Sequence, residues 1–199
     1  MYTQAYYKSI FDSHGGIMKT KELEKENIYY HKRQELMQKG LIEKVRYGYF
    51  RWVDTDDFSD VRTITHLYPD AIFCLETALH YYDYSNRTPR NWHLAVDKNS
   101  GKSRFKIDYP FIKPYYYEPS VLNIGVTSCN MDGQIVRIYN KDRLICDCLR
   151  YRNKMDREIF NRAIRSYVID PEKNISSMLE YAQQLRVLKI AKDLIGVWL

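Results

Sequence analysis

Six consecutive residues near the N-terminus combine side chains that can recognise the edges of DNA bases. They are Tyr29, Tyr30, His31, Lys32, Arg33 and Gln34. An arginine can donate two hydrogen bonds to guanine and a glutamine can bond adenine in the same way, while lysine and tyrosine suit phosphates. This segment therefore predicts a surface that reads duplex DNA.

Two segments, residues 19–21 before this run and residues 46–51 after it, carry further groups suited to the DNA backbone. The turn at Arg46, Tyr47 and Gly48 offers a cationic tip for a phosphate or for the minor groove. We expect DNA contacts from both segments, at Lys19, Thr20, Lys21, Arg46, Tyr47, Tyr49 and Arg51.

The elements that would position these residues follow from periodicity and from helix end signals. Residues 2–13 have the apolar spacing of an amphipathic helix, which Gly15 and Gly16 end. Thr20 is the predicted N-cap of a short second helix, and Asn27 that of a third helix over 28–39, which Gly40 ends. Residues 41–45 and 49–52 are predicted strands of a hairpin. This order is typical of a winged helix-turn-helix, whose second paired helix enters the major groove.

Two alternatives stay open for this region. Lysine and arginine on a short helix can simply face water, and Tyr29 or Tyr30 can belong to the core. Winged helices also serve as protein-interaction modules, so the pattern alone does not establish a DNA ligand.

Charge and composition agree with a nucleic-acid partner. The chain has 199 residues, 28% charged and 45% hydrophobic, with a net charge of +6. Residues 1–52 hold ten Lys or Arg against six Asp or Glu, so the positive excess is densest there. The sequence shows neither a signal peptide nor an apolar run long enough for a membrane span, so we expect a cytoplasmic protein without a membrane partner.

The chain is expected to contain two domains. An acidic stretch predicts a linker over 54–60, between a winged-helix domain at 1–53 and a larger mixed domain at 61–199. In the second domain, Gly101 and Asp132-Gly133 mark expected hairpin turns. The expected strands are 92–96, 105–107, 112–116, 124–127 and 135–138. From residue 140 the period becomes helical, so the fold class is α+β with a helical C-terminal end.

A second basic cluster surrounds the expected turn at Gly101. Its members are Lys98, Lys102, Arg104 and Lys106. A solvated turn is the favoured interpretation, and an extension of the DNA-binding surface is the alternative.

The sequence offers little for catalysis or for metal binding. The four cysteines form no C-x-x-C pair, and His66, His80 and His93 lack partners at metal-ligand spacing. The chain contains no G-x-S-x-G, no phosphate-binding glycine loop and no H-E-x-x-H. Asp70, Asp97 and Asp108 lie near strands, but the Glu-x-Lys triplet of metal-dependent nucleases is absent there. We expect no enzyme, no cofactor and no metal, with a DNA-targeted nuclease as the alternative.

Across nearly its whole length the chain resembles the AbiEi family, the antitoxins of type IV AbiE abortive-infection systems. The stretches that carry the resemblance are residues 15–17, 41–50, 71–81, 92–96 and 136–150. The most specific part is the helix start Asp142-Arg143-Leu144 with Asp147. The sequence departs from the family pattern at Glu76, where serine is usual, and at Asn140, where serine or proline is usual.

The resemblance implies a function that the residues alone do not show. Such antitoxins repress their own operon at inverted repeats through the N-terminal domain. Their C-terminal domain neutralises a nucleotidyltransferase-like toxin without forming a stable complex, as part of phage defence. Monomers that cooperate on the DNA would satisfy the inverted repeats. The alternative is a second domain that sequesters a toxin in a tight complex.

Overall fold

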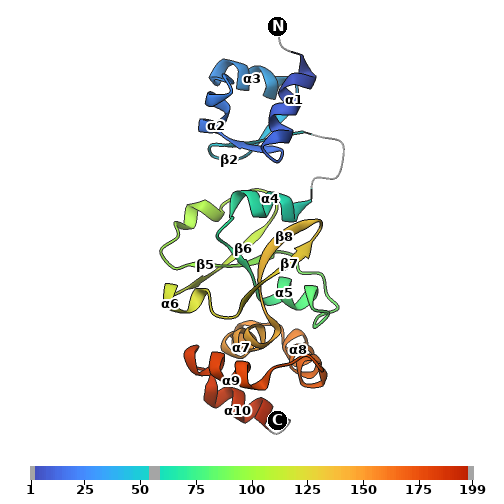
Figure 1. Cartoon of the computed structure of the whole chain (residues 1–199), viewed down its shortest axis with the longest axis vertical. Helices are drawn as coiled ribbons and strands as arrows, with labels where there is room; N and C mark the ends of the chain where they lie inside the picture. Colours follow the sequence, from blue (N-terminus) through green and yellow to red (C-terminus); the bar gives the residue numbers. More distant parts are fainter. Residues whose placement is uncertain (1–2, 54–58, 197–199) are drawn as a thin grey trace. The chain divides into compact units, whose positions relative to one another are not determined.

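A computed structural model describes residues 3–53 and 59–196, a mixed α+β protein with ten α-helices and two sheets in this described part (Figure 1). The chain divides into two compact units, one of Met1–Pro69 with Lys106–Pro110 and the other of Asp70–Phe105 with Phe111–Leu199. Residues 54–58 of the predicted linker lie outside the described residues. Asp60 of that linker begins a helix of the N-terminal unit.

The N-terminal unit contains three helices, a three-stranded sheet and a fourth helix. In chain order they are α1 (Gln4–Ser13), β1 (Ile17–Lys19), α2 (Thr20–Lys25), α3 (Tyr30–Gln38), β2 (Ile42–Arg46), β3 (Tyr49–Trp52) and α4 (Asp60–Leu67). The sheet order is β1-β3-β2, and both pairings are antiparallel. Phe11, Met18, Leu23 and Leu36 are almost fully buried, so the first three helices and the sheet enclose one common core.

Each of the first three helices ends in the same local motif. The residue after the C-cap has a positive φ, at Gly15 (75°), Asn27 (60°) and Gly40 (68°). The next amide reaches back to the last turn, as in Leu41 N–H to Leu36 O at 2.9 Å. This is the Schellman arrangement, which satisfies carbonyls that the helix leaves free. The predicted stops at the glycines are confirmed.

Two predicted helix starts are wrong, and local bonding explains both. The N-cap of α2 is Lys19, whose N–H donates to Glu22 Oε2 at 2.7 Å, while Thr20 is the first helical residue. Asn27 closes α2 instead of opening α3, because Ile28 N–H bonds Leu23 O at 2.8 Å while the Ile28 side chain enters the core. The third helix therefore begins only at Tyr30.

The C-terminal unit combines a five-stranded sheet with two helices between its strands and four helices that follow the last strand. Its strands are β4 (Ile72–Phe73), β5 (Trp92–Asp97), β6 (Ile112–Tyr117), β7 (Val126–Met131) and β8 (Gln134–Tyr139). Its helices are α5 (Leu75–Tyr81), α6 (Pro119–Leu122), α7 (Lys141–Tyr151), α8 (Arg157–Ile169), α9 (Ile175–Gln184) and α10 (Leu188–Ile195), with 3₁₀ turns η1 (Lys102–Phe105) and η2 (Arg152–Lys154).

The sheet order is β6-β5-β4-β8-β7, with parallel pairs β5–β6 and β4–β8. The hairpin at Asp132-Gly133 is confirmed, since β7 and β8 are antiparallel neighbours. The hairpin predicted at Gly101 is wrong, because parallel β5 and β6 require a crossover and not a tight turn. The strand predicted at 105–107 is also wrong, because Phe105 ends the turn η1 with its ring buried. The strand predicted at 124–127 begins at Val126 and runs to Met131.

The last four helices gather at one end of the C-terminal unit, as predicted (Figure 1). Helix α7 packs against α8, α9 and α10 and is buried from Asp142 to Leu149. Among the described residues, no helix combines the length and apolar character needed to cross a bilayer.

Candidate nucleic-acid interface

Helix α3 exposes a row of hydrogen-bonding and aromatic side chains. Tyr29, its N-cap, and Tyr30 are 58% and 61% exposed, and His31 and Gln38 are exposed as well. Gln34 is half-buried between them, one helical turn from Tyr30 and one from Gln38. Gln38 was not predicted, although its spacing from Gln34 would have revealed it. This outward row can meet base edges.

Arg33 faces the interior instead of this outward row. Its Nη1 donates to Ile28 O at 3.0 Å and to a Glu24 carboxylate oxygen at 3.4 Å, and its guanidinium lies 5.9 Å from the Phe50 ring centre. The residue is only 8% exposed. The arginine predicted to read guanine therefore holds the turn between α2 and α3 in place.

The charge of Lys32 is compensated within the helix. Its ammonium pairs with Glu35 and lies 5.7 Å from the Tyr7 ring centre. Glu35 also accepts from Lys39 at 2.7 Å. The hydrogen bonds from Lys32 and Lys39 lower the pKa of Glu35 to about 2, so the carboxylate stays charged. Lys32 and Lys39 share this one carboxylate, so the three side chains together keep a single net positive charge.

The start of α2 is tied to the turn of the β2–β3 hairpin. Both the N–H and the hydroxyl of Thr20 donate to Gly48 O, at 2.9 and 3.3 Å. Gly48 has a φ of 76°, which only glycine adopts at little cost. These bonds bring the predicted residues Lys19, Thr20 and Lys21 beside the hairpin turn, although Thr20 and Gly48 are 28 positions apart in the sequence.

The hairpin holds its cations over tyrosine rings. The guanidinium of Arg46 stacks 3.9 Å from the Tyr49 ring centre, and the Lys19 ammonium lies 5.8 Å from the same ring. At the tip, Lys44 lies 5.4 Å from the ring of Tyr47, which is 92% exposed. Such cation–π contacts orient a charge without neutralising it.

Lys44 was not among the predicted contacts. The pairing register of β2 shifts between Lys44 and Arg46, so a simple alternation along the strand did not place its side chain.

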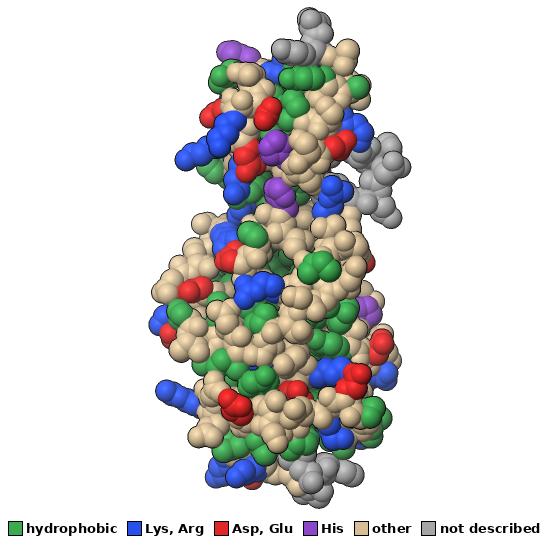
Figure 2. Space-filling model, viewed as in Figure 1, with side chains coloured by type: hydrophobic (Ala, Val, Ile, Leu, Met, Phe, Trp, Pro, Cys, Tyr) green, Lys and Arg blue, Asp and Glu red, His purple; other side chains and the backbone are tan. Residues whose placement is uncertain are grey.

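Arg51 differs from these residues, because it pairs with Glu43 on the neighbouring strand. Basic and acidic side chains thus lie side by side on the N-terminal unit, as Figure 2 shows. An interface with DNA here would rely on a few cations around a polar face, and not on a uniformly basic surface.

The second predicted basic cluster does not form a single cationic turn. Lys98 pairs with Glu118 at 2.6 Å. Arg104 is bidentate on Asp70, and this lowers the pKa of the Asp70 carboxyl. Lys102 is exposed on η1, whereas Lys106 belongs to the N-terminal unit. Two of the four cations, Lys98 and Arg104, are therefore paired with carboxylates.

His93 serves to position a helix. Its ring Nδ1 accepts from the backbone N–H of Glu76 at 3.3 Å, and the backbone N–H of His93 donates to Thr77 Oγ1 at 2.8 Å. Burial, helped by the nearby charge of Lys113, lowers the pKa of His93 to about 3, which keeps the imidazole neutral. His93 thus secures the first turn of α5.

The other candidates for chemistry form no site in the described part of the chain. Burial lowers the pKa of His66 and raises the pKa of the Cys74 and Cys148 thiols. In residues 3–53 and 59–196, His, Cys, Asp and Glu side chains nowhere gather in a group of three suited to a metal ion.

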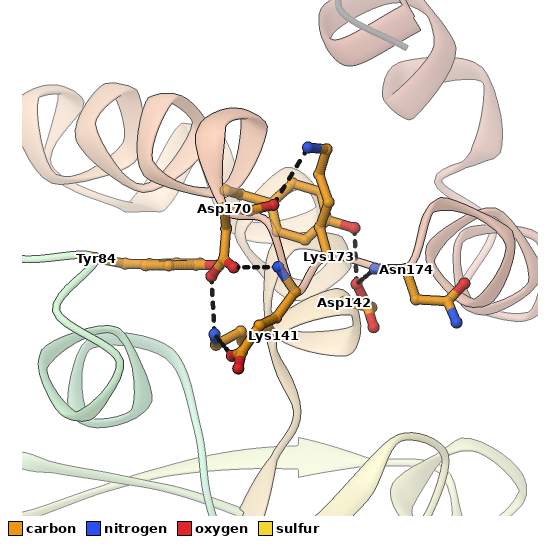
Figure 3. Close-up of polar contacts among 8 residues, drawn as sticks. Tyr84, Lys141, Asp142, Asp170, Lys173 and Asn174 are labelled. Atoms are coloured by element: carbon orange, nitrogen blue, oxygen red, sulfur yellow. Dashed lines mark hydrogen bonds and ion pairs between the residues drawn. The ribbon is translucent and has the colours of Figure 1, made fainter.

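The motif at the start of α7 is a buried structural clamp. Asn140 caps the helix by accepting Arg143 N–H at 2.9 Å. Asp142 accepts from Tyr167 Oη and from Asn174 N–H, each at 2.8 Å (Figure 3). These bonds join the start of α7 to α8 and to the N-cap of α9.

A second carboxylate completes this clamp. Asp170 accepts from Tyr84 Oη at 2.6 Å and pairs with Lys141 at 2.9 Å (Figure 3). Burial acts in the opposite direction, but the Tyr84 hydroxyl and the Lys141 ammonium lower the pKa of Asp170 to about 2. Tyr84 follows α5, so the clamp also secures the end of that helix.

Arg143 and Asp147 form a fully buried ion pair in the same helix. The two side chains have no exposed area and are 3.2 Å apart, from Nε to Oδ2. Nη1 of Arg143 donates to Val121 O at 2.7 Å and to Ile124 O at 2.8 Å. At Gly125 (φ 68°), a Cβ would lie 2.5 Å from Arg143 Cβ, so only glycine fits there. These contacts assign the motif to stability and not to an exposed site.

A comparison of the chain with models of known protein families and with curated proteins found no match.

Proposed function

We propose that residues 1–53 form a winged helix-turn-helix that binds duplex DNA, with α3 in the major groove and the β2–β3 hairpin as the wing. The observation that carries this proposal is the outward row on α3, with Tyr30, His31 and Gln38 exposed and Gln34 half-buried, together with a β2–β3 hairpin that Thr20 ties to α2. The element order and the antiparallel β1-β3-β2 sheet support it.

The side chains divide into two roles under this proposal. His31 and Gln34 read base edges, for which their hydrogen-bonding side chains are suited. Lys19, Lys21 and Lys44 bind phosphates, with Tyr29 and Tyr47 at the two ends of the contact. Arg33 supports α3 from inside and reads no base.

The first experiment measures binding to the DNA upstream of the protein's own gene by fluorescence anisotropy over a range of salt. Affinity should fall steeply as salt rises, because phosphate contacts release counterions. Lys21→Ala should weaken binding to all duplexes alike and reduce the salt slope by about one. Gln34→Ala should cost about 1–3 kcal/mol on the preferred sequence and relax the choice of base.

Lys8→Ala is the matched control, since Lys8 lies on α1 and its ammonium pairs with Asp12 at 3.8 Å. Its salt slope should equal that of the wild type. If Lys21→Ala and Gln34→Ala bind every duplex as the wild type does, α3 and the wing are not the interface. Arg33→Ala is unsuitable as a test, because it removes bonds inside the unit.

We further propose that the protein is an antitoxin that represses its own operon at inverted repeats, as its resemblance to AbiEi proteins implies. The C-terminal unit would neutralise a nucleotidyltransferase-like toxin. In cells whose growth is inhibited by the toxin from the neighbouring gene, coexpression of this protein should restore growth. The Lys21→Ala/Gln34→Ala variant should restore growth as well. Protection that disappears with DNA binding would contradict separate roles for the two units.

Two competing functions have direct tests. Co-purification of a stoichiometric complex would favour a C-terminal unit that sequesters a toxin. Plasmid nicking with magnesium or manganese would favour a DNA-targeted nuclease. We expect neither result.

A further inference from the structure

Helix α8 has two apolar sides, and the core of the C-terminal unit uses only one of them. Ile159, Ala163 and Tyr167 are buried. The second side carries Phe160, Ile164, Val168 and Ile169, of which the first three are half-buried. Ile169 is 80% exposed, the second-highest value among the large hydrophobic residues that the structure describes as exposed. Aliphatic surface of this kind is costly to leave in water.

This second side forms one wall of a groove. The groove has a volume of about 520 Å³ and is lined by Phe160, Asn161, Ile164, Arg165, Val168 and Ile169 of α8 and by Leu194 of α10. Leu194 is itself 43% exposed. The size is within the range of sites that accept several side chains. Apolar side chains thus line an open groove between two helices.

Arginines border the groove along the length of α8. Arg165 contributes to its wall, while Arg157, Arg162 and Arg165 line the adjoining hollow on the same helix. Within residues 3–53 and 59–196, none of the three guanidiniums has a carboxylate within 4.0 Å. Glu158 also lines this hollow, and both Glu158 and Asp156 pair with Arg87. Three arginines against one carboxylate leave this side of the groove with a net positive charge.

We propose that this groove binds an acidic amphipathic helix of a partner protein. The aliphatic floor fits apolar anchors one helical turn apart, and the arginine rim complements carboxylates beside those anchors. Arginine is suited to such pairs because its planar guanidinium can donate two parallel hydrogen bonds to one carboxylate. A nucleic acid would use the arginines but would leave Ile164, Ile169 and Leu194 without a counterpart. The inference goes beyond the proposed function and does not depend on it.

The test uses the full chain and a labelled synthetic helix of about fifteen residues, with leucines at i, i+3 and i+7 and glutamates beside them. Fluorescence anisotropy should show binding that weakens with salt. The same peptide with lysines in place of the glutamates should not bind. Arg162→Glu/Arg165→Glu should weaken the acidic peptide at least tenfold. Ile169→Ser, at a position exposed in the structure, should weaken it several-fold at any salt.

Lys102→Glu is the matched control, because Lys102 is an exposed cation on η1 outside the groove. It should bind the acidic peptide as the wild type does. The proposal is overturned if the acidic peptide does not bind, if both peptides bind equally, or if the Arg162→Glu/Arg165→Glu variant binds normally.

Other occupants would give distinct results, each of which overturns the proposal. A concentration-dependent dimer in sedimentation that Ile169→Ser abolishes would assign the groove to a second copy of the chain. Peptide binding seen only after deletion of residues 197–199 would assign it to the chain's own end. Tighter binding of an unstructured oligonucleotide, lost in Arg162→Glu/Arg165→Glu, would assign it to nucleic acid.

Discussion

Helices α3 and α7 contain similar polar and charged residues but present them in opposite ways. Helix α3 exposes Tyr30, His31 and Gln38 and hides its only arginine. Helix α7 buries every residue from Asp142 to Leu149 and exposes Arg150. The contrast shows that residue types alone do not separate an exposed helix face from a buried structural clamp.

The physical difference lies in what surrounds each helix. Helix α7 contacts α8, α9 and α10, so each of its polar groups needs a partner inside the protein. Helix α3 covers only a small core, and water solvates its outer face. Function should therefore be sought on α3 and on the outer side of α8, and stability on α7.

The largest expected effect is at the buried ion pair. Arg143→Met leaves the Asp147 carboxylate without its partner, and we expect a loss of about 3–5 kcal/mol in the free energy of unfolding. Urea denaturation measures it. Arg150→Met, on the exposed side of the same helix, should cost less than about 1 kcal/mol. Equal effects at the two positions would remove the distinction between the faces of α7.

Arg33 should show a smaller effect of the same kind in the N-terminal unit. Arg33→Met removes the bonds to Ile28 O and Glu24, and we expect a loss of about 1–3 kcal/mol. Lys32→Met, the adjacent residue with an exposed ion pair, should cost less than about 1 kcal/mol. If Arg33→Met lowers DNA affinity while the unfolding free energy stays unchanged, Arg33 contacts DNA after all.

His93 should make stability depend on pH. Its pKa is about 3 in the folded protein and about 6.5 when unfolded, so between these values only the unfolded chain takes up the proton. The contribution of His93 to the free energy of unfolding should be fully present above pH 6.5. It should fall as the pH decreases toward 3, by at most about 1.4 kcal/mol per pH unit. Urea denaturation from pH 7.5 to 5 measures this.

The matched variants for this prediction are His93→Gln and His80→Gln. The contribution should be missing from His93→Gln, and His80→Gln should keep it because His80 is exposed. Unchanged pH dependence in His93→Gln would show that another group titrates.

The smallest effect on stability should come from the exposed face of α3. Gln34→Ala and His31→Ala should change the free energy of unfolding by no more than about 0.5 kcal/mol while they alter DNA selectivity. Urea denaturation and anisotropy on the same samples measure both quantities. A large loss of stability at either position would make α3 a structural helix like α7.

The sequence by itself determined the elements that depend on local bonding. Gly15 and Gly40 end their helices where predicted, because a positive φ at these positions lets the next amides bond back to the last turn. The helical period after residue 140 and the turn at Asp132-Gly133 are local in the same way. The α+β class follows from these elements.

Only the tertiary structure decided which way the polar side chains point and how distant strands pair. Arg33 turns inward because Ile28 O, Glu24 and the Phe50 ring surround it. Strands β5 and β6 lie parallel, which excludes the predicted hairpin. The polar motif within residues 136–150 was visible in the sequence. Its burial was not, because the partners of Asp142, Arg143 and Asp170 come from segments as far away as Tyr84 and Val121.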